Sequence, residues 1–295
     1  MTADSDKPFD RELLFQRRRR HAGTAQSYDF LLQRVADDFV ERLQIVKRDF
    51  PCAINVGSHH GVVSRAIGSL ANVGAVIDCD RTAELLAQCD GLRVLSDEQA
   101  LPFGNSNIDL AVSALSLQFV NDLPGALVQI RRSLKSDGLF LGALLGGDTL
   151  RELRQAWYIA EEEVTGGASP RVAPFIDVRS LGALAQRAGF ALPVADSDLV
   201  TVTYETPLNL MQELRAMGAS NVLNSRRRVP VIRKLLLRAC EVYAERFGLA
   251  DGRVPATFEL LTLTCWVPDE SQPQPLRPGS AEISLADVLG KKSQS

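Results

Sequence analysis

Residues 52–80 constrain the fold of this chain more than any other stretch. An apolar run from Cys52 to Val56 leads into a turn with glycines at positions 57 and 61, and a helical segment follows. A second apolar run, Val73 to Ile77, ends on Asp78. A strand, a glycine turn, a helix and a strand that ends on an acid form the first half of a nucleotide-binding α/β domain. In such domains the acid accepts hydrogen bonds from ribose hydroxyls.

The spacing of the glycines decides between classes of nucleotide. A dinucleotide fold has two further glycines after the first, but His59 and Val62 stand at those positions when counting starts at Gly57. The chain also has no G-x-x-x-x-G-K-[ST] loop. The remaining Gly57-x-x-x-Gly61 turn resembles that of class I S-adenosylmethionine-dependent methyltransferases, whose ligand carries no phosphate. The alternative is a βαβ crossover whose glycine turn binds nothing.

The composition is that of an ordinary globular chain. Of 295 residues, 45% are hydrophobic and 23% charged, and the net charge of −3 gives no electrostatic case for nucleic acid. The five cysteines form no C-x-x-C pair, so we expect reduced, buried thiols. No apolar run reaches the length of a membrane span, and the N-terminus lacks the apolar region of a signal peptide. We therefore expect a bacterial cytoplasmic protein.

Strands and helices alternate along the chain. Apolar runs predict strands at 52–56, 73–77, 92–95, 109–117, 139–145, 199–204 and 256–266. Helical periodicity predicts helices at 9–23, 27–47, 62–67, 82–89, 123–134, 149–164, 178–189, 208–220 and 229–247, with a glycine-capped turn at 135–138. Continuous apolar strands between helices predict an α/β fold with a doubly wound, parallel sheet covered on both faces.

The order of these elements predicts the domain organisation. We expect an N-terminal helical segment at 1–48, a sheet domain at 49–267 and an extended C-terminal tail at 268–295. A helical insertion at about 205–250 precedes the last strand and is placed to cap the mouth of the sheet. Arg17 to Arg20 form a basic run, which is either a solvated face or a docking surface for an acidic partner or an anionic membrane.

Ligands of an open α/β sheet bind at the carboxyl ends of its strands. Asp78 is therefore predicted to hold the ribose, and Asp97 or Glu98 to accept the adenine amine. Residues 113–118 are predicted to lie under the reacting methyl group, with Ser113 and Gln118 as candidates for catalysis. The predicted cofactor contacts are Asn55, Gly57, Ser58, Gly61, Asp78, Cys79, Asp97, Glu98 and Ser113.

The sequence lacks the motifs of metal sites and of catalytic nucleophiles. His59 and His60 are adjacent, His21 is the only other histidine, and no H-E-x-x-H or Cys/His cluster is present, so we predict no metal site. No G-x-S-x-G elbow occurs either. Methyl transfer from a sulfonium needs no protein nucleophile, because positioning and exclusion of water account for most of the rate.

Several segments, spread over nearly the whole chain, recur in one group of proteins. They are Phe9–Arg11, Leu101–Phe103, Leu123–Leu134, Pro174–Arg179, Gln186–Phe190, Leu214–Asn221 and Pro278–Ala281. In these segments the chain resembles the methyltransferase-like family that includes the mitochondrial complex I assembly factor 5. The resemblance implies a class I methyltransferase fold with an antiparallel last strand and S-adenosylmethionine as cofactor. For mitochondrial members it implies hydroxylation of an arginine on a complex I subunit. A more distant similarity, mainly in the sheet domain, is to the malonyl-carrier-protein O-methyltransferase of biotin synthesis.

Two residues depart from the family pattern. Asn55 replaces the usual acid and carries no charge to complement the ligand's ammonium, and His59 replaces the middle glycine and adds bulk. We favour a methyltransferase that acts on a protein in assembly of respiratory complex I (NADH-quinone oxidoreductase), peripheral to the inner membrane. The alternatives are an arginine hydroxylase on the same fold, a malonyl-carrier-protein O-methyltransferase, and a non-catalytic assembly chaperone.

Overall fold

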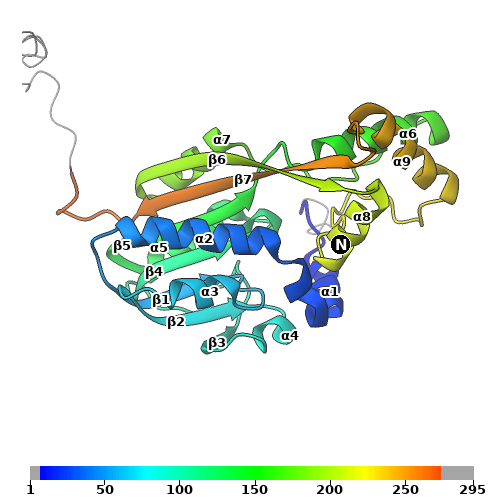
Figure 1. Cartoon of the computed structure of the whole chain (residues 1–295). Coiled ribbons are helices and arrows are strands. Elements are labelled where there is room, and N and C mark those ends of the chain that lie inside the picture. Colours follow the sequence, from blue (N-terminus) through cyan, green and yellow to red (C-terminus); the bar gives the residue numbers. More distant parts are fainter. Residues whose placement is uncertain (1–6, 274–295) are drawn as a thin grey trace, which may run out of the picture.

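The computed structural model describes residues 7–273, which contain a seven-stranded sheet in the order β3-β2-β1-β4-β5-β7-β6 (Figure 1). The strands are β1 Phe50–Val56, β2 Val73–Asp80, β3 Leu92–Leu95, β4 Ile108–Ala114, β5 Leu134–Leu145, β6 Ala191–Tyr204 and β7 Val254–Trp266. β1 to β5 are mutually parallel, whereas β7 runs antiparallel between β5 and β6. This topology confirms the predicted α/β class I methyltransferase fold with an antiparallel last strand.

Helices cover both faces of the sheet. They are α1 Arg11–His21, α2 Phe30–Ile45, α3 Val62–Ile67, α4 Ala83–Leu86, α5 Leu123–Ser133, α6 Arg151–Thr165, α7 Val178–Arg187, α8 Pro207–Ala216 and α9 Arg233–Phe247, with 3-10 turns at Ala22–Tyr28 and Leu117–Phe119. Side chains of β5 alternate between two buried clusters. Leu139 and Leu141 belong to a cluster with α2, α3 and α9, whereas Phe140 and Leu144 belong to one with α5 and α7. This alternation is the period of two expected of a strand buried on both faces.

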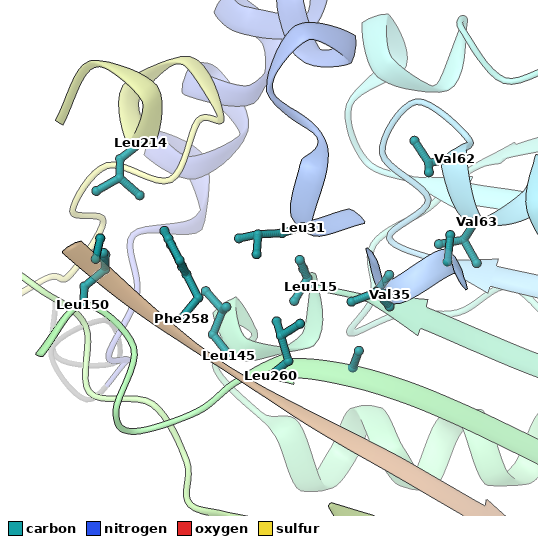
Figure 2. Close-up of a cluster of buried hydrophobic side chains, with 14 of the residues drawn as sticks. Leu31, Val35, Val62, Val63, Leu115, Leu145, Leu150, Leu214, Phe258 and Leu260 are labelled. Atoms are coloured by element: carbon teal, nitrogen blue, oxygen red, sulfur yellow. The ribbon is translucent and has the colours of Figure 1, made fainter. Parts of the chain in front are cut away.

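The first cluster extends to the carboxyl ends of the strands. Figure 2 shows Leu31 of α2 near Leu115, which follows β4, and Leu145 at the end of β5. Phe258 of β7 and Leu214 of α8 continue the same cluster toward the helices that lie between β6 and β7. Apolar side chains are therefore buried at the carboxyl ends of the strands, where ligands of this fold bind.

Several predicted boundaries were wrong. β6 begins at Ala191 rather than at residue 199, and β2 continues to Asp80 rather than ending at Ile77. The glycine-capped turn at 135–138 does not exist, because α5 ends at Ser133 and Leu134 is already extended as the first residue of β5. The β4–β5 register instead shifts between Ile108 and Leu110. β4 also ends at Ala114, three residues before its predicted end, because Leu115 adopts a left-handed backbone (φ +50°) that breaks the strand.

The N-terminal segment lies against the chain that follows α8. Asp10 caps α1 by accepting from Leu13 N at 3.1 Å, and its own N–H donates to Val222 O at 2.8 Å. Phe9 forms an isolated antiparallel bridge with Leu223. α1 and α8 consequently lie side by side near the carboxyl ends of the strands (Figure 1).

In the part of the chain that the structure describes, no helix is long and apolar enough to cross a membrane. Most of the tail predicted at 268–295 lies outside the described residues.

Candidate cofactor site

The glycine turn after β1 has the backbone that its spacing predicts. Gly57 (φ +69°) and Gly61 (φ +81°) both adopt the left-handed region, which favours glycine. The N–H groups of Gly57 and Ser58 donate to Cys79 O at 2.8 and 2.9 Å, which ties the turn to β2. A Cβ at position 57 would overlap the side chain of Ser116, so glycine is required there for space as well as for backbone conformation.

His59, at the usual position of the middle glycine, keeps a left-handed backbone (φ +51°) despite its side chain. Its ring crosses to the end of β4, where Nε2 lies 3.2 Å from Ala114 O. Burial, together with the nearby Arg18 and His60, lowers the pKa of His59 well below its ordinary value, so the ring is neutral near pH 7. The bulk expected at this position therefore lies against the end of β4, where the ring lines a cavity.

Asp78 does not lie at the edge of the sheet where the ribose was expected. It is 1% exposed, and its Oδ1 accepts from Asn55 Nδ2 at 3.1 Å and from the Ser64 hydroxyl of α3. Asn55 Nδ2 also donates to Ser64 Oγ at 2.8 Å. Burial raises the pKa of Asp78, which its bonds to Ser64 and Asn55 oppose. This internal network does not suit the ribose contact predicted for Asp78.

Asp80, the last residue of β2, is the carboxylate at the carboxyl end of this strand, although it is itself 0% exposed. Its Oδ2 accepts from His59 N at 3.0 Å and its Oδ1 from Thr82 N at 2.7 Å. Burial raises the pKa of Asp80 to about 6, with Arg18 lowering it and Glu98 raising it. Asp80 was not among the predicted cofactor contacts. The available signal was its position two residues after Asp78, on the same face of the strand and directly before a helix start.

Asp97 and Glu98, predicted to contact the adenine, pair with α1. Arg11 Nη2 lies 2.6 Å from Asp97 Oδ1 and 2.5 Å from Glu98 Oε2, and Ser116 Oγ donates to Glu98 Oε1 at 2.7 Å. Burial alone would raise the pKa of Glu98, but Arg11 and Arg18 hold it below its ordinary value. Both carboxylates predicted to bind the adenine are therefore occupied by side-chain partners within the protein. The adenine contact stays a prediction.

An apolar cavity of about 100 Å³ lies beside His59 at the ends of β4 and β5. It is enclosed by α1, α2 and the chain after α8, and its lining includes Leu14, Leu31, Leu115, Phe119, Leu145 and Met217. Gln118 also lines it, whereas Ser113 is buried in the sheet with its hydroxyl donating to Val56 O at 2.7 Å. Of the two predicted catalytic candidates, only Gln118 thus faces this cavity.

The three histidines all line this cavity, yet they do not form a metal site. Within residues 7–273, no group of three or more His, Cys, Asp or Glu side chains is arranged to hold a metal ion. His60 Nε2 instead lies 3.0 Å from Asp29 Oδ2.

The donor chemistry of this edge fits S-adenosylmethionine. The ligand's ribose, sulfonium and amino-acid end call for a carboxylate, an apolar wall and polar groups, and the edge offers Asp80, the cavity and a buried guanidinium from Arg18. Sites for ligands of this size measure roughly 300–1,000 Å³, so the present cavity accommodates only one end of it.

Comparisons with known proteins agree with this geometry. A family profile described as a methyltransferase domain matches residues 54–142. YcgJ of Bacillus subtilis superposes with a TM-score of 0.55 at 11% identity, covering 80% of this chain and 99% of its own. A Bacillus halodurans protein reaches the same TM-score at 14% identity, covering 79% and 98%. Fold and site together define a protein of the S-adenosylmethionine-dependent class I methyltransferase type.

Proteins related in sequence identify the family to which the chain belongs within this class. The "Arginine-hydroxylase NDUFAF5, mitochondrial" of Danio rerio is 38% identical over 277 residues, covering 90% of this chain and 85% of the zebrafish protein. The human protein of the same name is 37% identical, covering 97% and 87%. A "Malonyl-[acyl-carrier protein] O-methyltransferase" of Gallionella capsiferriformans is 32% identical, covering 91% and 95%. The chain belongs to the methyltransferase-like family that contains the NDUFAF5 arginine-hydroxylases.

Proposed function

We propose that this chain is an enzyme that binds S-adenosylmethionine along the carboxyl ends of β1, β2 and β4, with Asp80 on the ribose. The position of Asp80 carries the proposal. Its carboxylate is held between the glycine turn and the start of α4 by His59 N and Thr82 N. Each carboxylate oxygen keeps a further lone pair, which can accept from a ribose hydroxyl.

The residues around this edge position the ligand and exclude water. The backbone at Gly57 and Gly61 allows close approach, and Leu115 and Phe119 give an apolar wall to the cavity. When bound, S-adenosylmethionine supplies an activated methyl group on a sulfonium, which is already a good leaving group. Orientation and a water-free pocket are then what the protein contributes to methyl transfer.

The acceptor is proposed to approach through a second cavity of about 250 Å³. It adjoins the first, shares Leu31 and Phe119 with it, and is lined by the aromatic rings of Trp157, Phe175 and Phe258. A flexible side chain of a protein substrate suits such an apolar passage. The family resemblance supports a subunit of respiratory complex I as this substrate.

A second candidate is hydroxylation of an arginine on the same fold. The names of the relatives that are 37–38% identical favour it. O-methylation of a malonyl carrier protein rests on relatives at 32% identity and is the weaker alternative. The group added to the substrate distinguishes hydroxylation from methylation, and the identity of the modified substrate distinguishes the two methyltransferases.

We place the protein in the bacterial cytoplasm, at the surface of the inner membrane. The segment before α9 supports a peripheral contact, because Val229, Val231 and Ile232 are exposed beside Arg227 and Arg228.

Calorimetric titration with S-adenosylhomocysteine tests the proposal. Wild-type protein should bind it, Asp80→Asn should bind at least ~10-fold more weakly because a charged hydrogen-bond acceptor is lost, and the exposed control Asp90→Asn should bind like the wild type. A wild-type protein that binds no ligand would refute the proposal and favour an assembly chaperone. Mass spectrometry of a complex I subunit incubated with the protein then separates an added methylene from an added oxygen.

A further inference from the structure

Arg18 differs from the other arginines of the basic run at 17–20. Its side chain is 5% exposed and lines the cavity beside His59. Arg17 Nη1 donates to Asn221 O at 2.7 Å, Arg19 pairs with Glu84 at 3.0 Å, and Arg20 is exposed. The run thus presents three cations to its surroundings and buries the fourth at the candidate cofactor site.

The buried guanidinium lacks a full set of partners. Among the residues that the structure describes, Arg18 Nη1 is buried without a hydrogen-bond partner. The nearby carboxylate oxygen, Glu98 Oε1, lies 3.8 Å away and already accepts from Ser116, while Glu98 Oε2 accepts from Arg11. Burying a cation without hydrogen bonds is unfavourable, so this group is suited to bind an anion that enters the cavity.

A second unpartnered group faces the same cavity with the opposite polarity. Gln118 Nε2 donates to Leu115 O at 2.9 Å, which orients the amide, and its buried Oε1 has no partner within residues 7–273. The lining of the cavity therefore offers both a donor suited to an anion and an acceptor suited to an N–H group. An amino-acid group carries both a carboxylate and an ammonium, and the cavity has room for those few atoms.

The chain after α8 fixes Arg18 in this position. Gly218 has a left-handed backbone (φ +72°), and a Cβ there would lie 3.3 Å from Arg18 Cγ and 3.4 Å from Arg18 Cα. Glycine at position 218 therefore allows the chain after α8 to pack closely against Arg18. The Leu214–Asn221 motif, although distant in sequence from the glycine turn, thus helps to position Arg18.

We propose that Arg18 binds the carboxylate, and Gln118 Oε1 the ammonium, of the amino-acid end of the cofactor. This inference rests on the proposed function, since it assigns contacts within the same site. In the complex, Arg18 then pairs with the carboxylate of the ligand instead of with Glu98, which lies 3.8 Å away in the free protein. Binding of the ligand is therefore accompanied by a change in the side-chain contacts of α1.

Ligands that differ only at the amino-acid end test the inference. Wild-type protein is titrated with S-adenosylmethionine, with its decarboxylated analogue, with S-adenosylhomocysteine and with 5′-methylthioadenosine, which lacks the amino-acid end. We expect the decarboxylated analogue to bind roughly 10- to 100-fold more weakly than S-adenosylmethionine, the range for a charged hydrogen-bonded contact. This comparison needs no variant and cannot fail through misfolding.

Arg18→Gln and its surface control Arg20→Gln assign the effect to a residue. Arg18→Gln should weaken S-adenosylhomocysteine roughly 10- to 100-fold and leave 5′-methylthioadenosine unchanged, whereas Arg20→Gln should change neither. Equal loss for both ligands, or equal binding of S-adenosylmethionine and its decarboxylated analogue, would overturn the inference while leaving the proposed function intact. Failure of the wild type to bind any of the four would overturn both.

Discussion

Restoring the family's usual acid at position 55 should destabilise this protein. Asn55 and Asp78 are both 1% exposed, and Asn55 Nδ2 donates across 3.1 Å to Asp78 Oδ1 and across 2.8 Å to Ser64 Oγ. In Asn55→Asp, the donor disappears and two buried carboxylates face each other at that separation. Like charges so close cannot both ionise, so one of them must take up a proton.

The expected loss of stability is set by the cost of protonating one of the two carboxylates at pH 7. Keeping a carboxyl with an ordinary pKa near 4 protonated at pH 7 costs about 4 kcal/mol, since each pKa unit is worth about 1.4 kcal/mol. The folded state of the variant binds the extra proton more tightly than the unfolded state, so its stability rises as the pH falls. Most of the loss at pH 7 should therefore vanish near pH 4.

Urea unfolding followed by circular dichroism measures this loss. We expect Asn55→Asp to lower the free energy of unfolding by about 3–5 kcal/mol at pH 7 and by about 1 kcal/mol near pH 4. The exposed control Asn105→Asp should change it by less than about 0.5 kcal/mol. The swap Asn55→Asp/Asp78→Asn restores one amide and one carboxylate and should recover most of the stability. A loss below about 1 kcal/mol at pH 7, or a loss that does not depend on pH, would refute the reasoning.

Three further predictions follow from backbone conformation and charge. His59→Gly relieves a left-handed backbone that disfavours a side chain, so the free energy of unfolding should rise by about 1 kcal/mol. The change also removes the ring from the turn, so S-adenosylhomocysteine should bind more tightly in calorimetry, and unchanged affinity would mean that the ring does not obstruct the ligand. Gly218→Ala should lower the free energy of unfolding by about 1–2 kcal/mol because of its positive φ, compared with less than about 0.5 kcal/mol for Gly23→Ala in open space, and equal effects would contradict this. The pKa of Asp80 is raised to about 6 by burial, so its contribution to stability is fully present below pH 4 and is lost as the pH rises through 6. Relative to wild type, Asp80→Asn should therefore gain about 3 kcal/mol of stability between pH 4 and 7 in denaturant titrations, and a difference that stays constant over this range would count against the pKa shift.

The fold could be predicted because its signals are local. The alternation of apolar runs and helical periods and the glycine turn at 57–61 are both present in the structure. The antiparallel last strand was instead implied by the family resemblance and is confirmed by the pairing of β5 with β7. The exact strand ends could not be predicted, since they depend on local backbone such as the left-handed Leu115 and on the irregular start of β5.

The residues at the site depend on contacts that are distant in sequence. Asp78 and Asp80 share one face of β2, and only the pairing of Val56 with Cys79 shows that Asp80 stands level with the turn. Arg18 is one of four consecutive arginines, and its burial follows from the docking of α1 on the chain around Gly218. No pattern within either segment carries that information.

The contact between the ligand's ribose and Asp80 is central to the proposed cofactor site, and a structure with S-adenosylhomocysteine bound tests this contact most directly. We predict both ribose hydroxyls within hydrogen-bond distance of the Asp80 carboxylate, with Asp78 still paired to Asn55 and Ser64. Ribose density on any other carboxylate, or an undisturbed Arg11–Glu98 contact with no ligand beside Gly57 at saturating concentration, would contradict it.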